Sequence, residues 1–135
     1  MFLSLLSRKE KLKFLDLAIY MIGIDGEPTT IEQKLLDMML VELGDVAQEY
    51  TFEKSEDIDN TIDFFVKSNK VVKNIVFLNL VKITMQDDLY NTSEHLFLEK
   101  IQKKFEISQE KRRELMSIIY AERDVKERAR RIIEY

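Results

Sequence analysis

The sequence predicts an all-α protein, a compact bundle of about seven helices that forms a single domain over residues 1–135. Three observations lead to this fold class. The chain holds only three glycines and one proline, although sheets and long loops normally need more of both. Apolar residues recur at helical spacing along most of its length. Residues that commonly cap helices precede several of these apolar segments.

Two capping boxes mark the starts of the first two helices. In such a box, a hydroxyl side chain and a glutamate or glutamine three residues later bind each other's backbone amides. The residues are Ser7 with Glu10, and Thr30 with Gln33. The apolar stripes that follow end near Gly23 and Gly44, and glycine is typical of a helix end.

The middle of the chain is expected to hold the central helix. Residues 45–60 are acidic and weakly periodic, which indicates a short helix and a loop. Ser55 or Asp57 then caps a helix that ends near Val66. The segment 71–85 is apolar on nearly every side, a pattern typical of a helix buried in the middle of a bundle.

Three more helices are expected in the C-terminal part. Thr92 is predicted to cap one of them and Ser108 the next. The last segment, 122–135, has apolar residues at helical spacing among alternating charges. It is expected either to dock on the bundle as an amphipathic helix or to extend as an arm.

The two halves of the chain resemble each other. A shift of 62 residues places Asp25 on Asp87, Thr30 on Thr92 and Glu32 on Glu94. In each half an apolar helix, an acidic turn, a threonine and a second helix follow one another. The pattern predicts two helical hairpins, in residues 8–50 and 70–120, related by a pseudo-twofold axis.

The acidic turns are the main candidates for function. If they meet across the axis, six carboxylates form an oxygen-rich site for a divalent cation such as Ca²⁺. The candidate ligands are Asp25, Glu27, Glu32, Asp87, Asp88 and Glu94. The alternative is structural, because carboxylates also stabilise the positive ends of helices. The turn at Asp25 is not an EF-hand, since Leu36 occupies the position that requires a bidentate glutamate.

The first turn and its flanking helices resemble the TerB-like family, named for a bacterial tellurite-resistance protein. The resemblance is carried by residues 17–24, the Asp25-Gly26-Glu27 turn and Glu32, and it covers roughly residues 8–120. It implies an all-helical stress-response module with an acidic surface that can bind a metal and act through protein partners. It also implies that Asp25, Glu32, Asp87 and Glu94 are the candidate ligands.

No group of residues predicts an enzyme. The chain has no cysteine and one histidine, His95, one helical turn before Glu99. An enzyme would require a pocket joining His95 to the acidic turns, and we expect a non-catalytic protein. The alternative function is a helical scaffold for protein–protein interaction, or a homodimer, without a metal.

The distribution of charge bears on the partners. Residues 1–99 carry 10 basic and 18 acidic side chains, whereas residues 100–135 carry 11 basic and 7 acidic ones. The acidic part would repel a phosphate backbone, so no nucleic-acid partner is expected. No apolar segment is long enough to span a membrane. A cytoplasmic location and a protein partner are expected.

Overall fold

The computed structural model describes residues 1–24, 26–51, 57–85 and 92–135. These residues form six α-helices and two short 3₁₀ helices, and none of them lies in a β-strand. The α-helices are α1 (Arg8–Ile22), α2 (Thr30–Leu43), α3 (Ile58–Val66), α4 (Lys70–Met85), α5 (Thr92–Lys104) and α6 (Gln109–Glu134). The 3₁₀ helices are η1 (Leu3–Leu5) and η2 (Gly44–Glu49). The all-α prediction is confirmed.

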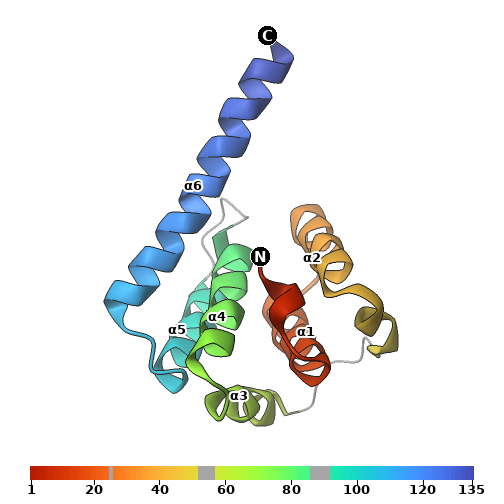
Figure 1. Ribbon diagram of the computed structural model, residues 1–135, viewed down its shortest axis with the longest axis vertical. Helices are drawn as coiled ribbons and strands as arrows, with labels where there is room; N and C mark the ends of the chain where they lie inside the picture. Colours follow the sequence, from red (N-terminus) through yellow and green to blue (C-terminus); the bar gives the residue numbers. More distant parts are fainter. Residues whose placement is uncertain (25, 52–56, 86–91) are drawn as a thin grey trace.

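Helix α4 is the central element, as its apolar sequence predicts. It packs against α1, α3, α5 and α6. Figure 1 shows it in the middle of the bundle, with α1 and α2 on one side and α5 and α6 on the other. Its largest side chain, Phe77, is fully buried, together with Phe14 of α1 and Phe65 of α3. These aromatic rings anchor one continuous core.

The two predicted capping boxes are correct to within one residue. Ser7 and Glu10 form the expected capping box at α1. At α2 the box is formed by Thr29 and Glu32, so the prediction of Thr30 with Gln33 was wrong by one position. Thr92 is the first residue of α5, and the residue before it lies outside the described part of the chain.

Asp57 and Ser108 cap their helices as predicted. The Asp57 carboxylate accepts a hydrogen bond from the backbone amide of Asn60, and the Ser108 hydroxyl accepts one from that of Lys111. The other candidate for the first of these caps, residue 55, lies outside the described residues. The expected short helix after Gly44 is the 3₁₀ helix η2.

The two helices expected over residues 108–135 form one continuous helix, α6, of 26 residues. Because these two expected helices are one, the described residues form six α-helices, whereas about seven helices were expected. The first half of α6 packs against α4, and the second half extends away from the bundle (Figure 1). The last segment is therefore an arm. No helix in the described ranges is both long enough and apolar enough to cross a membrane.

Candidate functional site

Glu32 is the sequence-predicted ligand with the most unusual surroundings. It is 7% exposed, in the first turn of α2. One carboxylate oxygen, Oε1, accepts a hydrogen bond of 3.1 Å from the backbone amide of Thr29. The other oxygen, Oε2, is buried without a hydrogen-bond partner among the described residues. A buried polar atom without a partner is costly, and a bound ion or water is the usual remedy.

The other predicted ligands are divided between described and undescribed parts of the chain. Glu94 is 8% exposed in the first turn of α5 and has polar partners. Glu27 is exposed. Asp25, Asp87 and Asp88 lie outside the described residues. Among the described residues, the histidine, aspartate and glutamate side chains form no group of three that could hold a metal ion.

A small pocket joins His95 to Glu94, the arrangement that an enzyme would require. Its volume is about 110 Å³, and Arg112 and Tyr120 also line it. His95 Nε2 lies 2.9 Å from Glu99 Oε1, one helical turn further along α5. Pockets that bind small molecules usually measure about 300–1,000 Å³. The pocket has room for a few water molecules only.

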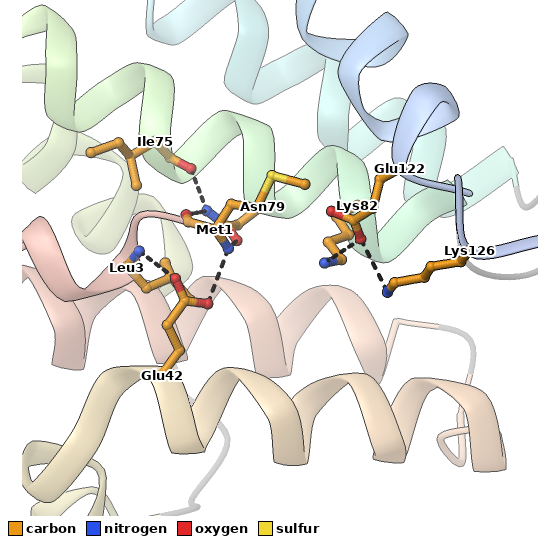
Figure 2. Close-up of polar contacts among 8 residues, drawn as sticks. All are labelled: Met1, Leu3, Glu42, Ile75, Asn79, Lys82, Glu122 and Lys126. Carbon is orange, nitrogen blue, oxygen red and sulfur yellow. Dashed lines mark hydrogen bonds and ion pairs between the residues drawn. The ribbon is translucent and has the colours of Figure 1, made fainter. Parts of the chain in front are cut away.

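Two polar clusters on α4 were not anticipated from the sequence. The first surrounds Asn79, which is fully buried. Its Oδ1 accepts a hydrogen bond of 2.9 Å from the Met1 ammonium, and its Nδ2 donates to the carbonyl oxygens of Met1 and Ile75. Glu42 of α2 lies 3.0 Å from the same ammonium and accepts a bond from the Leu3 amide (Figure 2). The cluster ties the first residues to α2 and α4.

The second cluster joins α4 to α6. Lys82, with a side chain that is 9% exposed, lies 2.8 Å from Glu122, and Lys126 lies 3.2 Å from the same carboxylate (Figure 2). Burial raises the pKa of Glu122, but its hydrogen bonds to the two lysines and their positive charges outweigh burial and lower that pKa below its ordinary value. Two cations therefore share one anion.

The same two lysines line a groove between α2 and α6. Its volume is about 170 Å³. Its other lining residues are Ile31, Lys34, Leu35 and Met38. Among the described residues, Glu122 is the one carboxylate bound to these lysines, so the groove combines an apolar wall with an excess of positive charge. Its size suits one apolar side chain of a protein ligand, next to a carboxylate.

One feature of the sequence could have indicated the two polar clusters on α4. Asn79 and Lys82 are the polar residues in an otherwise apolar stretch of α4, one helical turn apart. Polar groups on a buried helix need partners, so this spacing indicates that α4 has polar neighbours along one line. The distant partners themselves, Met1 for Asn79 and Glu122 for Lys82, lie 78 and 40 residues away along the chain, where no local pattern identifies them.

The chain was compared with protein families, characterised proteins and solved structures. No protein-family model matches the chain, and neither the characterised proteins nor the solved structures include a match to it.

Proposed function

We propose that the chain is a non-catalytic, TerB-like binding module that holds a divalent cation at its acidic turns and acts in bacterial stress response. The observation that carries the metal proposal is the buried Glu32 Oε2, which lacks a hydrogen-bond partner in the described part of the chain. Carboxylate oxygens are the ligands that calcium and magnesium prefer. A bound cation would supply the missing partner and offset the cost of burying the charge.

The proposed repeat is supported by the positions of the helices. Helices α1 and α4 begin at residues 8 and 70, and α2 and α5 begin at residues 30 and 92, so both pairs are 62 residues apart. Glu32 and Glu94 are each the third residue of a helix, and both are buried. We propose that the two hairpins are related by a pseudo-twofold axis that brings the acidic turns together.

Thermal unfolding of the chelator-treated protein tests the metal site. Addition of millimolar calcium, magnesium or manganese is expected to raise the Tm by several degrees with one of the ions, because a ligand that binds only the folded state stabilises it. The shift should disappear in Glu32→Gln and in the double variant Asp25→Asn with Asp87→Asn. Without metal, Glu32→Gln should be neutral or stabilising, since it removes a buried charge.

Glu10→Gln is the matched control. Glu10 occupies the same capping-box position in α1, where its carboxylate accepts a hydrogen bond of 2.7 Å from the Ser7 amide. The control should keep the metal shift even if it weakens its helix cap. The metal proposal fails if no ion shifts the Tm, or if Glu32→Gln shifts as much as the wild type.

The alternative function is a protein-interaction scaffold without a metal, which the groove between α2 and α6 favours. Its excess of lysine suits an acidic helical segment of another protein that inserts one apolar side chain. Selection from a library of helical peptides should enrich sequences with carboxylates beside an apolar residue. Their binding should be lost in Lys34→Glu and kept in the control Lys103→Glu. Enrichment without acidic residues would contradict this function.

A further inference from the structure

Helix α6 carries an apolar stripe that the bundle leaves exposed. Ile118, Val125 and Ile132 recur every seven residues and are 51%, 61% and 78% exposed. A seven-residue repeat places side chains along one line of a helix, and two helices pair along such a line. Ala121 lies beside the line, three residues after Ile118, and widens the apolar seam.

The stripe does not face the bundle. Ile119, the neighbour of Ile118, is 1% exposed and packs in the core, whereas Ile118, about 100° away around the helix, is half exposed. Glu122, four residues after Ile118, binds Lys82 of α4, so the stripe lies beside the docked side of α6 and not on it. The stripe therefore stays accessible while α6 is docked. Its members Val125 and Ile132 are well exposed and belong to the second half of α6, which extends away from the bundle in Figure 1.

The charges beside the stripe indicate which kind of helix can pack on it. Asp124 and Arg131 lie on one edge, seven residues apart and opposite in sign. Asp124 makes no ion pair with any described residue, and Arg131 is 3.5 Å from Glu127 on its own helix. In an antiparallel pair of identical helices, this edge of one helix lies along the same edge of the other and runs in the opposite direction. Asp124 of each copy then faces Arg131 of the other, which gives two equivalent ion pairs. A parallel pair would place Asp124 against the edge formed by Glu122 and Ala129, which offers no cation.

We propose that α6 of one copy pairs antiparallel with α6 of a second copy, over residues 118–135. If the twofold axis that relates the two helices passes between residues 126 and 127, Ala121 lies opposite Ile132 of the second copy. Val125 then lies opposite Arg128 of the second copy. The small alanine accommodates the isoleucine, and the aliphatic stem of Arg128 covers the valine. The paired segment is about 27 Å long, so the dimer is weak and dissociates on dilution. The proposal is independent of the metal site.

Sedimentation velocity over a concentration series up to about 100 μM tests the pairing, because mass action governs a weak dimer. The wild type should shift from monomer to dimer, and Ile132→Glu should remain a monomer at every concentration. The matched control is Ile133→Glu, since Ile133 is 82% exposed but lies off the seam. It should dimerise like the wild type. Circular dichroism establishes that each variant is folded.

Two further sets of variants test the antiparallel orientation. Asp124→Arg and Arg131→Asp should each weaken the dimer, and their combination should restore it. The chain has no cysteine, so engineered cysteines report on single contacts. Ala121→Cys combined with Ile132→Cys should form a disulfide-linked dimer, whereas Ile118→Cys alone should not.

The proposal is overturned by any of three results. The first is a wild type that remains a monomer throughout the concentration series. The second is an equal effect of Ile132→Glu and its control. The third is cross-linking through position 118, which would establish parallel pairing. The metal experiment measures the change of Tm with ion concentration, whereas this experiment measures the oligomeric state. Failure of one proposal is therefore distinguishable from failure of the other.

Discussion

Helix α4 and the arm of α6 are both helical, but different forces hold them in that form. Most residues of α4 are buried, and its apolar side chains contact four other helices. The arm is exposed on all sides, and its side chains pair with one another along the helix. Packing dictates the first helix, whereas local propensity and ion pairs favour the second. The same substitution should therefore have very different consequences in the two regions.

The largest effect is expected from Phe77→Ala in α4. The side chain is fully buried, so its removal leaves a cavity and should lower the free energy of unfolding by about 3–5 kcal/mol. Val125→Ala in the arm should change it by no more than about 0.5 kcal/mol. Urea denaturation of both variants measures the difference. Equal losses would mean that the arm is packed against something in solution.

A smaller loss, of about 2 kcal/mol, is expected from Asn79→Ala. The substitution leaves the Met1 ammonium and two backbone carbonyls without the bonds that Asn79 provides. Urea denaturation measures the loss. Asn74→Ala, at a half-buried position of the same helix that makes no such bonds to described residues, is the control and should cost less. A similar cost for both would show that the cluster contributes little.

The ion pair between α4 and α6 predicts a dependence on pH. The pKa of Glu122 is lowered in the folded state, so its contribution to stability is present above the unfolded pKa and is lost as the pH falls through the folded pKa. Glu122→Gln should therefore destabilise the protein at neutral pH. The difference from the wild type should narrow as the solution is acidified towards pH values below the ordinary glutamate range. Thermal unfolding across this range measures it, and a constant difference would contradict the assignment.

The smallest effect is expected from Arg130→Ala in the arm. Arg130 lies 2.6 Å from Glu127 and 3.8 Å from Glu134, and all three side chains are well exposed. Water and salt screen such pairs, so bundle stability should not change measurably. Helix content measured by circular dichroism should fall slightly at low salt and match the wild type at high salt. A large loss of stability would contradict the view that the arm is held locally.

Local signals predicted most of the fold. Capping residues and apolar periodicity located the helices, and the uninterrupted apolar run identified α4 as central. The capping box of α2 was predicted one residue too late because Thr29 and Thr30 are adjacent and each has a suitable partner three residues later, Glu32 or Gln33. The join between the two last helices was missed because apolar spacing weakens there, although helix-forming alanine, arginine and glutamate continue the helix.

The candidate site was less predictable. The sequence singled out Glu32 as an acidic residue near a turn, but its burial depends on how α2 packs against the bundle. The bond between Glu42 and the Met1 ammonium joins residues 41 positions apart, and the contact of Lys82 with Glu122 joins residues 40 apart. Such pairs result from tertiary structure, which local periodicity does not encode.

The contact of Arg123 with the end of α4 couples the position of α6 to that of α4. Arg123 Nη1 donates a hydrogen bond of 3.1 Å to the carbonyl oxygen of Met85, the last residue of α4. The preceding residue, Glu122, binds Lys82 of the same helix. A displacement of α6 would therefore act on α4 both at Lys82 and at Met85, which comes shortly before Asp87 and Asp88 in the sequence. Whatever restrains α6 thus also restrains the end of α4, the helix that precedes Asp87 and Asp88 in the sequence.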